Sequence, residues 1–155
     1  MDGDSFGQSV SVSDDRVIVG APAQNQPGLQ GAGAAYVFAR TPGGWIEEEK
    51  LSPSSVFAFG GFGVGVAVQD GIAVVGARAN GGPETTFAGE VFVFGFQEGA
   101  GWVEKQKLVP IDYGEKQQFG DSVALDGSFL VVGAPSTGGE LPIIGGAGSR
   151  VSICR

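Results

Sequence analysis

Three short stretches of the chain alternate between apolar and small residues at a fixed spacing. Val10 and Val12 stand between serines in the first stretch, and the same phase returns in residues 65–68 and 122–125. Alternation with a period of two predicts β-strands. Because the other phase holds only Ser, Gly or Ala, we expect these strands to lie innermost, where several strands crowd around a common axis.

Each alternating stretch is followed by a two-residue turn and a continuous apolar run. Asp-Gly between apolar stretches predicts a type I′ hairpin, because both turn residues need a positive φ. A continuous apolar run predicts a strand buried on both faces, and a proline ends such a strand because it cannot donate to the ladder. The turns are Asp14-Asp15, Asp70-Gly71 and Asp126-Gly127, and the runs are residues 17–22, 73–78 and 130–135.

A Gly-rich loop, a third strand and a charged fourth strand complete the pattern. Charged side chains protect an exposed sheet edge, so we place the fourth strand outermost. We predict that Val75 and Val132 are buried, whereas Glu48 and Lys105 are exposed. The loops are residues 23–32, 79–88 and 136–147, the third strands 33–38, 89–94 and 148–153, and the fourth strands 45–51 and 102–108.

The whole pattern repeats. Phe6-Gly7, Phe62-Gly63 and Phe119-Gly120 begin the units, at intervals of 56 and 57 residues. Repetition at this period indicates stacked supersecondary units, and four-stranded antiparallel sheets repeated radially form a β-propeller. We therefore predict an all-β protein, a partial β-propeller of about three blades in a single segment, residues 1–155. The blades are expected at residues 4–53, 60–110 and 117–155, and the third lacks its outermost strand.

Composition narrows the function classes. The net charge of −8 disfavours binding to the phosphate backbone of nucleic acids. The chain has no histidine, the commonest general base and metal ligand, and its only cysteine, Cys154, cannot form an internal disulfide. No apolar run reaches the length of a membrane span, and residues 1–4 do not resemble a signal peptide. We expect no enzymatic activity and no cofactor.

The repeated motifs resemble FG-GAP repeats, the unit of the integrin α-chain propeller and of many bacterial and algal surface proteins. The first unit carries Phe6-Gly7, Gly20-Ala21-Pro22, Tyr36-Val37-Phe38, Trp45 and Lys50-Leu51 in the family's order. Lacking long acidic loops, the chain is more similar to the prokaryotic or algal subgroup than to integrins. The resemblance implies a propeller used as a recognition surface, extracellular or at the cell surface, in adhesion or beside an enzyme.

The carboxylates are the candidates for metal ligands or catalytic groups. Asp2 and Asp4 offer too few oxygens for a Ca²⁺ site, and the Asp-x-Asp-x-Asp-Gly loop of many integrin repeats is absent. Glu47, Glu48 and Glu49 lie on one predicted strand, where successive side chains point to opposite faces, so we expect them to form a solvated edge rather than to converge. We predict no catalytic, metal-binding or cofactor-binding residue.

The remaining candidates favour structural roles. Trp45 and Trp102 are expected to pack at a blade edge rather than to stack on a sugar. The glycine-rich stretches 60–63 and 145–148 are not followed by Lys-Ser/Thr and a helix, so they indicate turns and close backbone approaches rather than phosphate loops. Cys154, beside the last strand, is expected to be an unreactive thiol.

These observations predict a non-enzymatic module for ligand binding or cell adhesion. Its partner is expected to be a protein or a glycan, bound through the three Gly-rich loops, since loops on a rigid scaffold carry function. The alternatives are an accessory propeller domain of a larger hydrolase or lyase, and a structural spacer. Because a propeller needs four to eight blades, we expect the open blade faces to meet further blades of a longer protein, or to associate with other copies of the chain.

Overall fold

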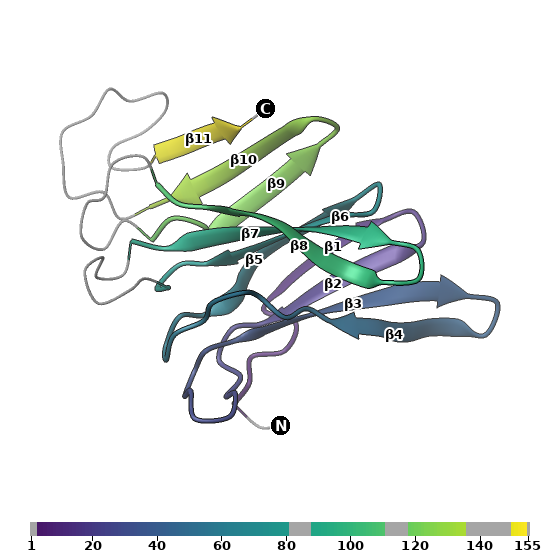
Figure 1. Ribbon diagram of the computed structural model, residues 1–155, viewed down its shortest axis with the longest axis horizontal. Helices are drawn as coiled ribbons and strands as arrows, with labels where there is room; N and C mark the ends of the chain where they lie inside the picture. The colour runs from purple at the N-terminus through teal and green to yellow at the C-terminus, as the bar shows by residue number, and fades with distance from the viewer. Residues whose placement is uncertain (1–2, 81–87, 111–117, 136–149, 155) are drawn as a thin grey trace.

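The computed structural model describes residues 3–80, 88–110, 118–135 and 150–154. The elements formed by these residues are all β-strands. Within these ranges there is no helix long and apolar enough to cross a membrane. The strands form three antiparallel sheets, which follow one another along the chain (Figure 1).

Each sheet is a blade whose strands are in sequence order. Blade 1 has the order β1-β2-β3-β4, blade 2 the order β5-β6-β7-β8, and blade 3 pairs β10 with β9 on one side and β11 on the other. The described elements thus form a partial β-propeller, with two four-stranded blades and a three-stranded one. The strands are β1 Ser9–Ser13, β2 Arg16–Ala21, β3 Ala34–Thr41, β4 Gly44–Lys50, β5 Phe62–Gln69, β6 Ile72–Ala77, β7 Glu90–Gln97, β8 Gly101–Leu108, β9 Ser122–Asp126, β10 Phe129–Ala134 and β11 Arg150–Cys154.

The first strands of the blades lie side by side, as the small residues predicted. β5 contacts both β1 and β9. The hydroxyl of Ser9 donates to the carbonyl of Gly63 over 2.7 Å, and the hydroxyl of Ser11 accepts from the amide of Val68 over 3.2 Å. A larger side chain in this phase would keep the neighbouring strand from coming so close. The innermost position of these strands and the outermost position of β4 and β8 are therefore confirmed.

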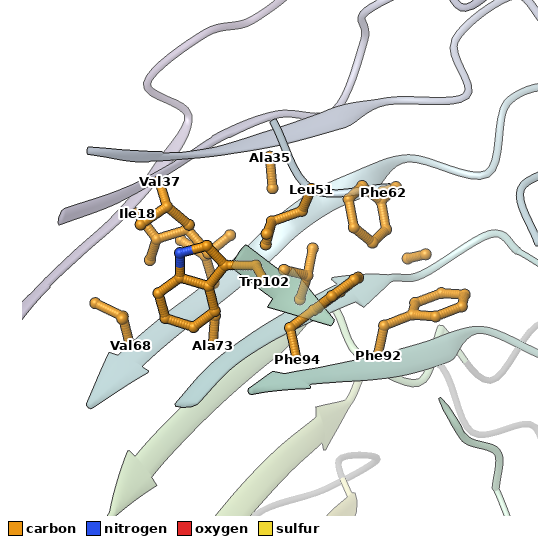
Figure 2. Packing of buried hydrophobic residues seen from close by; sticks show 13 residues of the cluster. Ile18, Ala35, Val37, Leu51, Phe62, Val68, Ala73, Phe92, Phe94 and Trp102 are labelled. Atoms are coloured by element: carbon orange, nitrogen blue, oxygen red, sulfur yellow. The ribbon is translucent and has the colours of Figure 1, made fainter. Parts of the chain in front are cut away.

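Two faces can be defined for each blade. The front face points toward the preceding blade and the back face toward the following one. The back face of blade 1 is aliphatic, whereas the front face of blade 2 is rich in aromatic side chains, and the two form one buried cluster (Figure 2). From blade 1 this cluster holds Ile18, Ala35, Val37 and Leu51, and from blade 2 it includes Phe62, Val66, Val68, Phe92, Phe94 and Trp102.

Blades 2 and 3 pack in the same way. The back face of blade 2 contributes Ala67, Val74 and Val91, and the front face of blade 3 contributes Phe119, Leu130 and Val132. Val75 and Val132 are fully buried and Lys105 is exposed, as predicted. Val131 of the apolar run 130–132 is only half-buried, because no described residue covers the back face of blade 3. Burial on both faces therefore holds for β6 but not for β10.

One predicted turn is shifted by a residue. Asp70 and Gly71 have φ values of 49° and 72°, so both turn residues have the positive φ of a type I′ turn. In blade 3, however, Asp126 pairs with Phe129 in the ladder, so the turn is Gly127-Ser128 and not Asp126-Gly127. The shift keeps Val123 and Leu125 in the phase that faces blade 2, because a slip by one residue would turn them to the other face.

The prediction for the three glutamates was wrong. In the β3–β4 ladder Val37 pairs with Glu49 and Phe38 pairs with Glu47, so Glu48 is an extra residue in a β-bulge. A bulge interrupts the alternation of side chains along a strand. Glu48 is half-buried instead of exposed, and both Glu48 and Glu49 reach the next blade.

Candidate binding surface at the loop end

The connections between strands divide into two kinds that lie at opposite ends of the blades. Tight hairpin turns join the first strand to the second and the third to the fourth, and they occupy one end (Figure 1). The other end, named the loop end here, holds the segment 22–33 of blade 1 and the connector 51–61, which leads from blade 1 to blade 2. Two backbone hydrogen bonds join these two segments, one of 2.7 Å from the amide of Phe59 to the carbonyl of Gln30 and one of 3.3 Å from the amide of Gly61 to the carbonyl of Gly31.

Amide side chains hold the 22–33 segment in shape. Gln26 and Leu29 exchange backbone hydrogen bonds of 2.9 and 2.8 Å, and the side chain of Gln26 donates to the carbonyl of Gly33. The amide of Gly31 donates to Asn25 Oδ1 over 2.8 Å. Internal hydrogen bonds of this kind satisfy the polar groups of an exposed loop, so this part of the loop end is preorganised.

The base of the same segment is tied to the start of the blade. Gln24 donates to Asp4 Oδ2 over 3.2 Å and accepts from the hydroxyl of Tyr36 over 2.7 Å. Asp4 thus takes part in a side-chain network of blade 1, and its predicted neighbour Asp2 lies outside the described residues. In the part of the chain that the structure describes, no three acidic or cysteine side chains come together to hold a metal ion.

A buried amide anchors the connector. Asn80 is fully buried; its Oδ1 accepts from the amide of Phe57 over 2.9 Å, and its Nδ2 donates to Glu90 over 2.6 Å and to the carbonyl of Ser55 over 3.3 Å. Glu90 also pairs with Lys107 over 3.2 Å. No sequence motif pointed to this network, because Asn80 stands in a variable loop and its side-chain partners come from two other segments, the connector and β7.

The connector presents two aromatic side chains to solvent. Phe57 is 37% exposed and Phe59 is 61% exposed. Phe59 also has a φ of 61°, a conformation that costs energy for a bulky residue and is found where surrounding contacts impose it. Its hydrogen bond to Gln30 supplies such a contact, and its ring lies against Gly31, where a Cβ atom would come within 3.2 Å of it.

Charge is distributed unevenly between the two ends. Residues 22–33 and 51–61 contain no Asp, Glu, Lys or Arg, although the chain as a whole has 26 such residues. At the other end, Asp14 and Asp15 occupy one turn, and Asp70 begins another. Segments 22–33 and 51–61 themselves therefore offer amides and aromatic rings rather than charged groups.

The other predicted loops are only partly described. Of residues 79–88, the structure describes 79, 80 and 88, and the whole of 136–147 lies outside the described residues. Arg78, which replaces the proline of the other units, is half in solvent and pairs with Asp121 of blade 3 over 3.0 Å. It therefore links two blades at this end.

Of the two glycine-rich stretches, the structure describes residues 60–63. There the glycines allow close approaches, as the sequence indicated. A Cβ at Gly60 would come within 2.6 Å of Asn80 Oδ1, and one at Gly63 would collide with the carbonyl of Ala34. Residues 145–148 are outside the described ranges, as is the side chain of Cys154, whose backbone ends β11.

The two tryptophans differ, although their positions in the repeat are equivalent. Trp102 is 5% exposed and packs between blades 1 and 2 as predicted, whereas Trp45 is 47% exposed. The indole N–H of Trp102 donates to Glu48 over 2.9 Å, and its backbone amide donates to Glu49 over 2.8 Å. Trp45 has no corresponding neighbour among the described residues, because it lies on the front face of blade 1.

Arg16 completes this contact between the blades. Its guanidinium binds both carboxylate oxygens of Glu48 over 3.0 Å and lies 4.6 Å from the centre of the Phe96 ring. Burial opposes the ionisation of Glu48, but hydrogen bonds from Arg16 and Trp102 and the charge of Arg16 outweigh it and lower the pKa of Glu48. The cluster formed by Arg16, Glu48 and Trp102 is structural, since it joins two blades of the same chain.

Comparison with known proteins agrees with this architecture. The FG-GAP repeat profile matches residues 1–38, 45–94 and 102–149. The first two matched segments end in β3 and β7, and the last two begin with Trp45 and Trp102, so a matched segment runs from the outer strand of one blade into the next. A search of the curated proteins found no match. The three matched segments cover most of the chain, which therefore belongs to the FG-GAP repeat family.

Proposed function

We propose that this chain is a non-enzymatic binding module of the adhesion type, which recognises a protein or glycan ligand through the loop end. The observation that carries the proposal is the exposure of Phe57 and Phe59 on a connector held in place by Asn80 and by the 22–33 segment. Exposed aromatic side chains on a fixed backbone bind ligands with little loss of conformational freedom.

The chemistry of this surface favours a neutral ligand. Phe59 presents a flat apolar ring, and the neighbouring Gln30 is an exposed side chain that can both donate and accept hydrogen bonds. Without charged residues in segments 22–33 and 51–61, recognition here would depend on stacking and hydrogen bonds rather than on ion pairs. A neutral oligosaccharide or an uncharged protein surface meets that description.

The place of action that we propose is outside the cell or at its surface, within a larger surface or secreted protein. Two other functions remain as alternatives: an accessory propeller that holds a hydrolase or lyase on its substrate, and a spacer with no ligand. The first alternative predicts binding to one polymer only, and the second predicts no binding.

A binding screen tests the proposal. The chain, labelled at its amino terminus, is applied to an array of neutral and acidic glycans and to immobilised matrix proteins. We expect binding to neutral glycans or to proteins, at least a tenfold loss with Phe59→Ala, and no loss with Phe129→Ala, an exposed phenylalanine beside the β9–β10 turn. Equal binding by both variants would contradict the loop end as the site, and binding to no probe would contradict the function.

A further inference from the structure

Phe59 holds an exposed ring on a strained backbone. Its φ is 61°, and 61% of the residue is exposed, so burial of the ring does not impose this conformation. The 22–33 segment imposes it instead, through the 2.7 Å hydrogen bond from the amide of Phe59 to the carbonyl of Gln30. Strained backbone of this kind is concentrated at ligand-binding sites, where it fixes a side chain in position before the ligand arrives.

Two amide side chains lie beside this ring. The ring lies against Gly31, whose amide donates to Asn25 Oδ1 over 2.8 Å. Asn25 and Gln30, the residue before Gly31, are both exposed. Among the residues that the structure describes, neither Asn25 Nδ2 nor the side-chain amide of Gln30 has a hydrogen-bond partner. Both side chains can therefore donate to a ligand, and Gln30 can also accept from one.

The charges around the ring disfavour an anionic ligand. The chain has a net charge of −8, and the two segments that form this surface contain no Lys or Arg. The charged side chains bonded to these segments in the described structure are the carboxylates of Asp4 and Glu104 and the ammonium of Lys107. That ammonium is already paired with Glu90 over 3.2 Å. An acidic sugar or an acidic peptide would therefore meet carboxylates here, and no unpaired cation among the described residues.

The size and order of the groups favour a sugar over a protein surface. A protein interface needs a broad apolar centre with polar groups kept to its rim. Here one exposed ring has amide groups within two residues of the glycine that it contacts. This arrangement matches a ligand that is apolar on one face and carries hydroxyl groups around its edge. A pyranose ring has both features within the dimensions of a single phenyl ring.

We propose that Phe59, Asn25 and Gln30 form a subsite for a neutral pyranose of an oligosaccharide. The C–H face of the sugar stacks on the Phe59 ring. Its hydroxyl groups accept hydrogen bonds from Asn25 Nδ2 and exchange them with the side-chain amide of Gln30. The subsite rests on the proposed function and narrows its ligand from a protein or a glycan to a neutral glycan.

Variants of nearly unchanged shape test the subsite. Phe59→Leu keeps an apolar side chain but removes the aromatic face. Asn25→Asp keeps the acceptor for the Gly31 amide and removes the Nδ2 donor, and Gln30→Glu removes the donor of a side chain without a described partner. Gln97→Glu, at an exposed position that ends β7, makes the same change at the opposite end of the blades and is the control. The probes are neutral hexasaccharides of glucose, galactose, mannose and xylose, the acidic polymers polygalacturonate and heparin, and immobilised matrix proteins.

We expect the parent to bind at least one neutral hexasaccharide with an affinity that does not change with ionic strength. Phe59→Leu should weaken binding about tenfold, and Asn25→Asp and Gln30→Glu about three- to tenfold each, as expected for the loss of one stacking contact or one hydrogen bond. Gln97→Glu should leave the affinity unchanged.

Three results would overturn the subsite while leaving the proposed function in place. They are binding to matrix proteins alone, binding to acidic polymers alone, and binding to a neutral hexasaccharide that Phe59→Leu and Gln30→Glu leave as tight as in the parent. Binding to none of the probes would overturn the subsite and the proposed function together.

Discussion

The carbonyl oxygen of Gly63 occupies the place where a Cβ atom of Gly20 would stand. Gly20 lies in β2 of blade 1, and Gly63 belongs to the Phe-Gly pair that begins blade 2. Gly76 and the carbonyl of Gly120 repeat this contact between blades 2 and 3. The backbone of the Phe-Gly pair of one blade therefore packs directly against the glycine of the Gly-Ala pair in the preceding blade. This contact explains why the two motifs occur together in each unit.

The first prediction follows from this contact. Gly20→Ala should lower the free energy of unfolding by about 2–3 kcal/mol, because the added methyl group must push apart two backbones that cannot move independently. Gly43→Ala is the control, since its Cβ would meet only Thr41 Oγ1 at 3.8 Å. Urea unfolding of both variants measures the difference. If Gly20→Ala were as mild as Gly43→Ala, the close contact would not hold in solution.

The second prediction concerns pH. The folded-state pKa of Glu48 is lowered, so its contribution to stability is fully present above the pKa of the unfolded chain, about 4.3, and is lost as the pH falls through the lower folded value. Glu48→Gln should cost about 1–2 kcal/mol at pH 7. The difference from the wild type should shrink below pH 4. Denaturation curves from pH 7 to pH 3 measure it, with Glu47→Gln, an exposed neighbour, as control. A difference independent of pH would contradict the ion pair with Arg16.

The third prediction concerns the order of the strands. Val132 is fully buried in the central strand of blade 3, so Val132→Ala should lower the free energy of unfolding by about 1–3 kcal/mol through lost burial and a partial cavity. Lys105→Ala, on the outer strand of blade 2, should change it by less than about 0.5 kcal/mol. Thermal or chemical unfolding distinguishes them. Equal losses would mean that the inner and outer strands do not differ in burial.

The fourth prediction concerns the anchor of the connector. Asn80→Ala should cost about 2–3 kcal/mol, because it leaves the amide of Phe57 without its acceptor and removes one of the two donors to the partly buried carboxylate of Glu90, the other being Lys107. Asn25→Ala removes a single hydrogen bond at an exposed site and should cost well under about 1 kcal/mol. Hydrogen exchange of the Phe57 amide adds a local readout. Unchanged protection of that amide in Asn80→Ala would argue against the anchoring role.

The fifth prediction concerns calcium. Millimolar Ca²⁺ should leave the melting temperature nearly unchanged, since a ligand stabilises only a native state that binds it. Asp4, the described half of the Asp2 and Asp4 pair, already accepts a hydrogen bond from Gln24. Differential scanning calorimetry with Ca²⁺ and with a chelator measures the shift. A rise of several degrees that disappears in Asp4→Ala would show that a site exists.

Much of the architecture could be predicted from the sequence alone. The period of 56 or 57 residues, the alternation in the first strands and the charges of the fourth strands are local patterns that report burial. Small residues such as Ser9 and Ser11 predicted the innermost strand because the closeness of the next strand excludes larger side chains. The Gly-rich loops differ between the units. Local patterns predicted where these loops lie but not which residues they contact, so the network around Asn80 was missed.

Only the tertiary structure decided which residues at equivalent positions of the repeat have the same burial and the same contacts. The bulge at Glu48 brings two successive carboxylates to Trp102, which strict alternation along a strand would forbid. Trp45 and Trp102 stand at equivalent positions, yet one is exposed and the other buried. The sequence around each tryptophan specifies its strand and its face. Its burial depends on whether another blade stands opposite, and that is a contact between segments some fifty residues apart, which no local pattern records.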